Sequence, residues 1–288
     1  MELDKKNSDN VNPIKGIKFD SNQSVWVEYS GENPVLFDKS EISILDYNVW
    51  FEPHNWTNRC SALLSLFETY NADVICLQEV ISSFTNYLMK SKFIRDNYII
   101  SYYEMSSYDT LILSKYHCNF YLRSFQRGTE TNMGRSLLLA EIFCKESSIF
   151  VGTSHLESLN NQYRRELQLK IVFSILNETE ICIFVGDCNF DNKTEDENID
   201  PNFVDAWKVW MMQNKLDKSD GYTMKAMGGF SAWRPDKLLF KANKLLELAY
   251  FEIVGKEAIS VNSDEWCNDA VDTPSDHYGL FGKFNIIL

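Results

Sequence analysis

The sequence lacks several features that would place it outside ordinary globular proteins. None of its 288 residues lies in an apolar run approaching the ~20 residues that a membrane-spanning helix needs. Residues 1–16 are polar and have no apolar core like that of a secretory signal peptide. The seven cysteines are irregularly spaced without a CxxC pair, and their odd number fits a reducing compartment. These absences predict an intracellular protein that is not bound to a membrane.

The sequence is also short of positive charge. Its net charge of −13 argues against binding to duplex DNA by bulk electrostatics. A nucleic-acid substrate stays open, because a divalent cation and a few basic residues can supply the positive field at one phosphate. Five arginines are either candidates for that task or ordinary surface charges: Arg123, Arg127, Arg135, Arg164 and Arg165.

What is present suits a large folded domain, because 44% of the residues are hydrophobic and only 24% are charged. We expect residues 1–40 to be a flexible N-terminus with a β-hairpin over 25–29 and 35–37. Residues 41–288 alternate between strand and helix patterns, including helices at 59–70, capped by Thr57 or Asn58, and 162–176. The acidic stretch 191–200 is expected to be a solvated loop. The pattern predicts an α/β (α+β) fold: two packed mixed β-sheets flanked by helices in a four-layer sandwich.

Five short segments carry polar side chains at the ends of predicted strands. They supply amide and carboxylate oxygens, which magnesium prefers, and imidazoles that can hold a phosphate. Together they predict a metal-assisted phosphodiester hydrolase. The segments are Asp46–Val49, Leu77–Val80, Thr153–Glu157, Gly186–Asn189 and Pro274–His277.

These segments resemble the endonuclease/exonuclease/phosphatase superfamily, over about residues 42–288. Within it the chain looks most like the branch of tyrosyl-DNA phosphodiesterase 2. The stretches that carry this second likeness are Thr153–Ser158 with the helix bearing Arg165, Gln168 and Leu169, then Val204–Trp207, and Pro274–Leu280 with the final strand.

The resemblance implies a hydrolase that depends on Mg²⁺, with Mn²⁺ as an alternative metal. Its substrate would be the 5′-phosphotyrosyl bond between a DNA end, single-stranded at that end, and a trapped topoisomerase. A monomer that acts in DNA repair, in the nucleus or cytoplasm, is the corresponding expectation.

The resemblance assigns the metal to Glu79, with Asn48 and Asp276 in support. A carboxylate that ends an apolar strand is costly to bury unless it meets a cation or a donor. The alternatives are an exposed strand-end glutamate and, for Asn48, an ordinary turn asparagine.

Asp187 would orient and deprotonate the attacking water, and Asn189 would hold a phosphate oxygen. Their spacing puts both on one side of an extended segment. His155 and His277 would bracket the phosphate and stabilise charge on its oxygens, with Asp276 orienting an imidazole. A polar turn and a structural histidine are the alternatives for Asp187 and His155.

Four further residues would contact substrate or support the site: Arg135, Ser154, Trp233 and Asp236. The chain departs from the family at Lys237, where the family has arginine, so only the acid of that pair is carried over. It also departs at Asp46, which adds a carboxylate, and at Met224, where the branch has a tryptophan of the DNA groove. Trp233 is either a substitute stacking surface or a core residue.

Two other functions compete with this interpretation. One is the same chemistry on another phosphate ester, such as an RNA end, abasic DNA or a phosphoinositide. The other is a binding module without activity, which the presence of Glu79, Asp187 and His277 disfavours.

Overall fold

The computed structural model describes residues 11–32, 34–105, 107–145, 147–190, 193–216, 221–226, 231–260 and 272–287. The strands are β1 (Asn12–Asp20), β2 (Val25–Glu28), β3 (Glu41–Asn48), β4 (Val74–Val80), β5 (Ile99–Tyr102), β6 (Asp109–Ser114), β7 (Cys118–Ser124), β8 (Ser136–Phe143), β9 (Ser148–His155), β10 (Ile181–Asp187), β11 (Phe203–Asp205), β12 (Asp236–Lys241), β13 (Leu246–Val254) and β14 (Gly279–Ile286). The helices are α1 (Trp56–Tyr70), α2 (Ser82–Leu88), α3 (Lys92–Asn97), α4 (Gln162–Leu176), α5 (Ala206–Gln213) and the 3₁₀ helix η1 (Lys193–Asn198).

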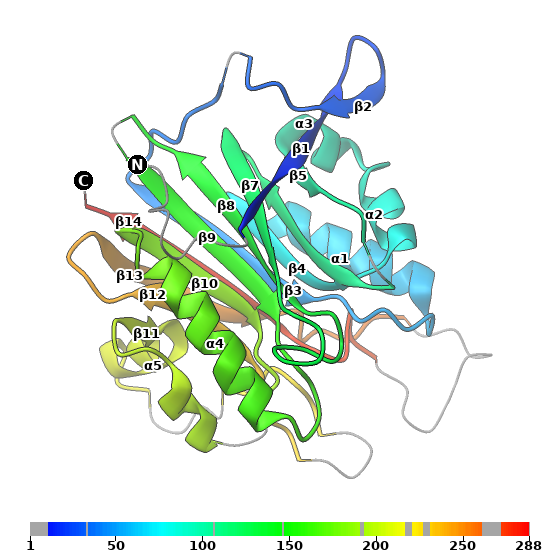
Figure 1. Cartoon of the computed structure of the whole chain (residues 1–288). Coiled ribbons are helices and arrows are strands. Elements are labelled where there is room, and N and C mark those ends of the chain that lie inside the picture. Colours follow the sequence, from blue (N-terminus) through cyan, green and yellow to red (C-terminus); the bar gives the residue numbers. More distant parts are fainter. Residues whose placement is uncertain are drawn as a thin grey trace.

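The fold is mixed α/β, with one large curled sheet and helices on its outside (Figure 1). Its strands follow one path in the order β11-β12-β10-β9-β8-β7-β1-β5-β6-β4-β3-β14-β13, with β2 paired to β1. Because the path is continuous, the predicted division into two sheets of a four-layer sandwich is not confirmed.

Strand β1 joins the two halves of the sheet. Its residues 12–14 pair with β7, and its residues 15–18 pair with β5. Within the N-terminus that we expected to be flexible, residues 12–20 therefore form a paired strand. The hairpin partner of β2 is β1 rather than 35–37, where Phe37 forms a single bridge to Cys144. Strand β1 is hard to predict from the sequence, because Ile17 is its one buried hydrophobic residue, between polar and partly exposed neighbours.

Three apolar clusters stabilise the arrangement. One lies between the two halves of the sheet and includes Ile44, Ile112, Leu138 and Ile183. The second joins the outer face of β3, β4 and β6 to α1, α2 and α3, and the third joins the outer face of β8, β9 and β10 to α4. Helices thus cover both outer faces while the core fills the inside (Figure 1).

Two units of strand, helix and parallel strand bring the polar strand ends together. In β3–α1–β4, Asn48 lies opposite Gln78, and in β9–α4–β10, His155 lies opposite Asp187. Parallel strands end at the same edge of a sheet. Strands β12 and β14 run antiparallel beside β10 and β3, so their first residues reach the same edge.

Helix α4 begins and ends where the sequence predicts, but α1 differs at its start. It begins at Trp56 after Asn55, so neither Thr57 nor Asn58 is the N-cap. The stretch 191–200 is also not simply a solvated loop. It contains η1, and Glu195 of η1 is buried against Arg165.

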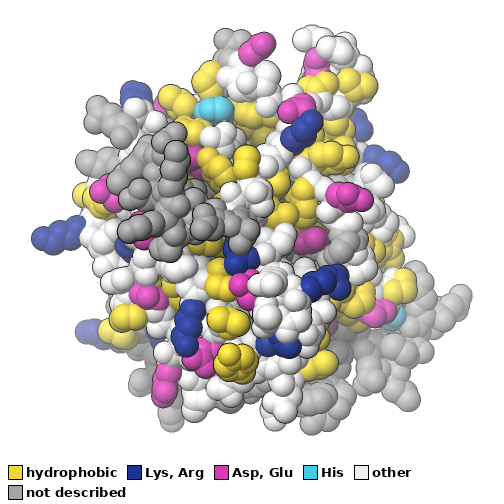
Figure 2. All heavy atoms as spheres, viewed as in Figure 1, with side chains coloured by type: hydrophobic (Ala, Val, Ile, Leu, Met, Phe, Trp, Pro, Cys, Tyr) yellow, Lys and Arg dark blue, Asp and Glu magenta, His cyan; other side chains and the backbone are white. Residues whose placement is uncertain are grey.

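Within the described part of the chain, no helix combines the length and apolar character needed to cross a membrane. On the face shown in Figure 2, basic and acidic side chains are interspersed among hydrophobic and uncharged atoms.

Candidate active site

Asp187, the last residue of β10, lies at the centre of the polar edge. Its Oδ2 accepts a hydrogen bond from Asn48 Nδ2 at 3.0 Å. The same oxygen lies 3.3 Å from His155 Nε2 and 3.8 Å from His277 Nε2. Burial alone would raise the pKa of the Asp187 carboxyl, but His155 and His277 hold that pKa below its ordinary value. The carboxylate therefore stays ionised at neutral pH.

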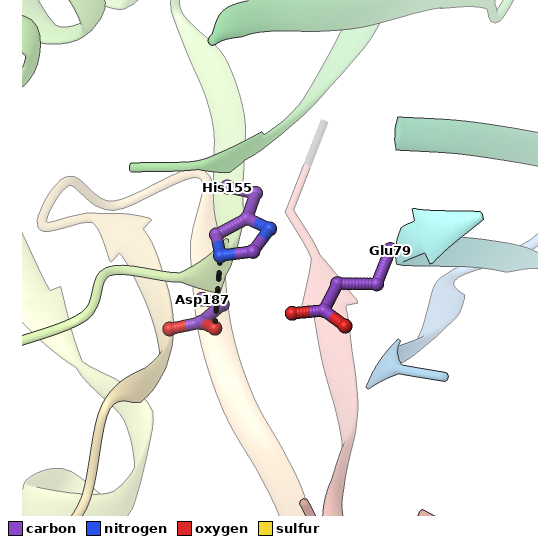
Figure 3. A group of neighbouring side chains, drawn as sticks. All are labelled: Glu79, His155 and Asp187. Carbon is purple, nitrogen blue, oxygen red and sulfur yellow. Dashed lines mark ion pairs between the residues drawn. The ribbon is translucent and has the colours of Figure 1, made fainter. Parts of the chain in front are cut away.

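Glu79 is aimed at this centre by an irregularity in β4. The pairing of β4 with β6 shifts between Leu77 and Val80, and Glu79 has a left-handed φ of 57°. Such bulges redirect a side chain, and the strained backbone is typical of functional positions. The Glu79 carboxylate accepts hydrogen bonds from Asn48 Nδ2 at 3.3 Å and from the Phe51 N–H at 3.2 Å. Figure 3 shows it pointing toward Asp187 and His155.

The predicted site residues include two groups that could hold a metal ion. In each group the possible ligand atoms lie within 4.8 Å of one another. One group is Glu79, His155 and Asp187, and the other is Asp187, Asp236 and His277. Burial, and then the charge of Asp276, raise the pKa of Glu79 to about 7. Burial also raises the pKa of Asp276. Carboxylates whose charges repel each other in a buried site suit a hard divalent cation, which would offset that repulsion.

The two histidines of the site differ in charge. Burial would lower the pKa of His277, but Asp236, whose Oδ2 lies 2.9 Å from Nδ1, and Asp187 raise it well above its ordinary value. Burial, and then Arg135, lower the pKa of His155 to about 3. One imidazole is therefore a cation at neutral pH and the other is neutral.

Arg135 lies against the neutral histidine. Its Nη1 is 3.0 Å from His155 Nδ1 and its Nη2 is 3.2 Å from His155 Nε2. The other four candidate arginines have different surroundings. Arg123 pairs with Glu130, Arg164 donates to loop carbonyls, Arg165 pairs with Glu195, and Arg127 is exposed.

The turn after β10 places Asn189 beside Asp187. The Asn189 N–H donates to Asp187 Oδ1 at 2.9 Å, and Asn189 Nδ2 donates to the Leu156 carbonyl at 3.1 Å. Just before this turn, Gly186 lets β10 lie close to β9, because a Cβ there would lie 2.1 Å from the Ser154 carbonyl oxygen and its φ is 144°.

The remaining predicted site residues have different surroundings. Asp236 reaches the site through His277. Ser154 has a buried hydroxyl that donates to the Ser136 carbonyl at 2.7 Å, and a contact of Ser154 with substrate stays a prediction. Trp233 is half-buried and bridges to Met224, which also bridges to His277. Its contact with substrate stays a prediction.

Two departures from the family pattern now have a location. Lys237 is buried and points to Asp196 of η1, at 2.8 Å. Asp46 is buried under the site, where its Oδ1 accepts a hydrogen bond from Gln78 Nε2 at 2.7 Å. Burial, and then the charge of Asp236, raise the pKa of Asp46.

An aromatic pair at the site was missed from the sequence. The rings of Phe51 and Tyr108 stack with centroids 4.8 Å apart. The Tyr108 ring lies 6.1 Å from His155 and 5.2 Å from the Arg135 guanidinium carbon. Phe51 lies two residues after the segment Asp46–Val49, but an aromatic residue after a strand is too common to indicate a site.

Comparisons with known proteins point to one group. A family profile described as the Endonuclease/Exonuclease/phosphatase family matches residues 47–277. Tyrosyl-DNA phosphodiesterase 2 of Rattus norvegicus is 27% identical over 284 residues, which cover 93% of this chain and 74% of that protein. A crystal structure of humanized D. rerio TDP2 with 14 mutations has a TM-score of 0.69 and 25% identity, over 86% of this chain and 100% of that one. D. rerio TDP2 complexed with single strand DNA product has a TM-score of 0.67 and 24% identity, over the same shares.

Proposed function

This chain belongs to the Endonuclease/Exonuclease/phosphatase family, and from that premise we propose that it is a Mg²⁺-dependent phosphodiesterase, with Mn²⁺ as an alternative metal. Its proposed substrate is the 5′-phosphotyrosyl bond between a single-stranded DNA end and a trapped topoisomerase. The relatives named tyrosyl-DNA phosphodiesterase 2 support the choice of bond, and the single strand DNA product bound to one of them supports the choice of polymer. The observation that carries the proposal is the meeting of Asp187 with Asn48, His155 and His277 beside Glu79.

The metal would be held by Glu79, with Asn48 and Asp276 in support, and when bound it would polarise the phosphate oxygens. Asn48 donates to Glu79 and Asp187, so it orders both carboxylates. Ser275 Oγ lies 3.2 Å from Asp276 Oδ1 and fixes that side chain.

Side chains of the protein would promote the displacement of tyrosine from phosphorus by water. Asp187 is ionised and would orient and deprotonate a water for in-line attack on phosphorus. The new bond joins the water oxygen to phosphorus, the bond from phosphorus to the tyrosine oxygen breaks, and the products are a 5′-phosphate and a phenolate. Because a free phenol has a pKa of about 10, the phenolate leaves without strong protonation.

Positive charge and donors around the phosphate would stabilise the transition state. His277 is a cation held by Asp236, and Arg135 is a second one beside His155. Asn189 would hold a phosphate oxygen through the second hydrogen of Nδ2, because the first is donated to the Leu156 carbonyl. Trp233 is proposed to offer a stacking surface next to Met224.

The same chemistry on another phosphate ester is the second candidate, with RNA ends, abasic DNA and phosphoinositides as substrates. The net charge of −13 favours small or exposed phosphates over long duplex tracts.

We further propose residues 41–288 as the catalytic domain, and a packing of the two sheet halves as two mixed sheets in a four-layer sandwich. The apolar cluster between the halves supports that packing. A monomeric state and a place in the nucleus or cytoplasm stay predictions.

The test is hydrolysis of a single-stranded oligonucleotide with a 5′-phosphotyrosine, beside its 3′ isomer, with Mg²⁺ and then with EDTA. Cleavage of the 5′ adduct alone, to a 5′-phosphate and abolished by EDTA, is expected. No cleavage, combined with activity on an RNA end, abasic DNA or a phosphoinositide, would keep the site and overturn the substrate.

A further inference from the structure

Arg59, in the first turn of α1, is a buried cation whose hydrogen bonds are complete. Its residue surface is only 1% exposed. A guanidinium has five N–H donors, and all five are used here. The acceptors are five backbone carbonyls: Pro274 from Nε at 3.1 Å, Glu52 and His54 from Nη1 at 2.7 and 3.1 Å, and Val49 and Trp50 from Nη2 at 2.7 and 2.6 Å.

Four of these carbonyls belong to the loop 49–54, which presents N–H groups to the proposed metal side of the site. The Trp50 N–H donates to Asn48 Oδ1 at 3.0 Å, and the Phe51 N–H donates to Glu79 Oε2 at 3.2 Å. Arg59 therefore binds the carbonyl groups of the same loop whose N–H groups orient Asn48 and Glu79.

The fifth carbonyl belongs to the segment that leads to Asp276. The next residue, Ser275, donates through Oγ to the Asn48 carbonyl at 2.7 Å and lies 3.2 Å from Asp276 Oδ1. Through Pro274 and the loop, Arg59 links the backbone around Asn48 to the backbone around Asp276. These segments are more than 200 residues apart in the sequence.

The charge of Arg59 is also unusual. Among the described residues, no carboxylate lies within ion-pair distance of it, whereas Arg165 at the same place in α4 pairs with Glu195 at 2.7 Å. A buried cation without an ionic partner is costly unless its surroundings compensate for it. The five carbonyl oxygens and the face of the Trp50 ring, whose centroid lies 4.3 Å from the guanidinium carbon, supply that compensation.

We infer that Arg59 is a positioning residue, which holds loop 49–54 and segment 274–276 so that Asn48, Glu79 and Asp276 face one cation. The inference rests on the proposed function to the extent that it assigns the metal to this half of the site.

The test compares Arg59→Lys with the matched control Arg165→Lys. Lysine keeps the charge but has three donors in place of five and no planar fork. Mn²⁺ binding is measured by electron paramagnetic resonance without substrate. We expect Arg59→Lys to weaken Mn²⁺ binding about 10–100-fold, as loss of supporting groups does, and Arg165→Lys to change it less than about threefold. Equal affinities of the two variants would overturn the inference.

If Arg59→Lys does not fold, Ser275→Ala interrupts the same linkage with a smaller change. It should weaken Mn²⁺ binding several-fold while its melting temperature stays close to that of the wild type. Unchanged Mn²⁺ affinity in Ser275→Ala would then overturn the inference.

Failure of this inference can be distinguished from failure of the proposed function, because Mn²⁺ binding needs no substrate. A wild-type protein that binds Mn²⁺ and leaves the 5′-phosphotyrosyl bond intact, with the loss confined to Arg59→Lys, overturns the substrate and keeps the inference. Cleavage of that bond by the wild type, with normal Mn²⁺ affinity in Arg59→Lys, keeps the substrate and overturns the inference. A wild-type protein without Mn²⁺ affinity overturns both.

Discussion

The units β3–α1–β4 and β9–α4–β10 follow the same backbone plan. Each has a 15-residue helix between two parallel strands, and each helix carries a fully buried arginine in its first turn, Arg59 or Arg165. Both arginines donate to carbonyls of the loop that precedes their helix. Both units deliver two polar side chains to the same edge of the sheet.

The units differ in where they place charge. In the second unit Arg165 is neutralised by Glu195, and the strand ends carry His155 and the ionised Asp187. In the first unit the buried arginine contacts carbonyls and the Trp50 ring, and the strand ends carry Asn48 and Glu79. Burial is the main cause that raises the pKa of Glu79 to about 7. Under the proposed function, this one backbone plan would serve two tasks, with a metal-holding half and a half that handles water and phosphate.

The largest effect is expected from Asp187→Asn, which removes the central group of the second unit. Turnover should fall by about 10²–10⁴-fold, the usual contribution of a general base, while the fold is kept. Hydrolysis of the 5′-phosphotyrosyl oligonucleotide measures this, with Asp38→Asn, an exposed loop acid, as control. A variant that keeps most of its activity would show that another residue orients the water.

Glu79→Gln should reveal the buried charge of the first unit. The raised pKa means that ionised Glu79 destabilises the folded, metal-free protein, and that this penalty grows above the unfolded pKa and is complete above about 7. Metal-free Glu79→Gln should therefore melt above the wild type at about pH 8. At about pH 4, below the unfolded pKa of about 4.3, it should melt close to the wild type, because Glu79 is then largely protonated in both the folded and the unfolded protein. Added Mg²⁺ should raise the melting temperature of the wild type only.

A melting temperature of Glu79→Gln that falls below the wild type at both pH values would contradict this account. It would mean that Glu79 stabilises the fold through its hydrogen bonds with Asn48 and Phe51 more than its charge destabilises it.

Asp236→Asn should shift the pH dependence. Burial lowers the pKa of His277, and Asp236 is the main group that raises it. Without that carboxylate the imidazolium is lost at a lower pH, so the alkaline limb of the activity profile should move to lower pH. Activity at about pH 8 should fall roughly tenfold, as for a lost charge-stabilising group. An unmoved alkaline limb would show that His277 does not act as a cation.

The smallest effect is expected from Lys237→Arg, which restores the residue of the family pattern. Lys237 points to Asp196 and away from Asp187. Turnover should stay within about twofold, and only the melting temperature should change, because the larger guanidinium must fit a buried position that faces Asp196. A large gain in turnover would place this position in the site after all.

The sequence predicted which polar side chains lie close together better than it predicted the arrangement of the sheet. Asn48, Glu79, His155, Asp187 and His277 end or precede strands with clear apolar runs, and the βαβ order brings such ends together. Ser154 does not join this group, because strand neighbours point to opposite faces. Its hydroxyl therefore faces Ser136 rather than the site.

Other features had no local signal. Strand β1 has a single buried hydrophobic residue, so its role between the two sheet halves comes from long-range pairing. Arg59 sits in an ordinary amphipathic helix, and its five acceptors lie in two segments far apart in sequence. The Phe51–Tyr108 pair likewise depends on loops that meet only in the folded chain.

The division of labour between the two units is tested most directly by titrating Mn²⁺ into Glu79→Gln and Asp187→Asn in the absence of substrate. The account predicts that Glu79→Gln binds Mn²⁺ about 10–100-fold more weakly, whereas Asp187→Asn keeps an affinity near that of the wild type although its turnover is lost. Loss of binding in Asp187→Asn, with normal binding in Glu79→Gln, would contradict it.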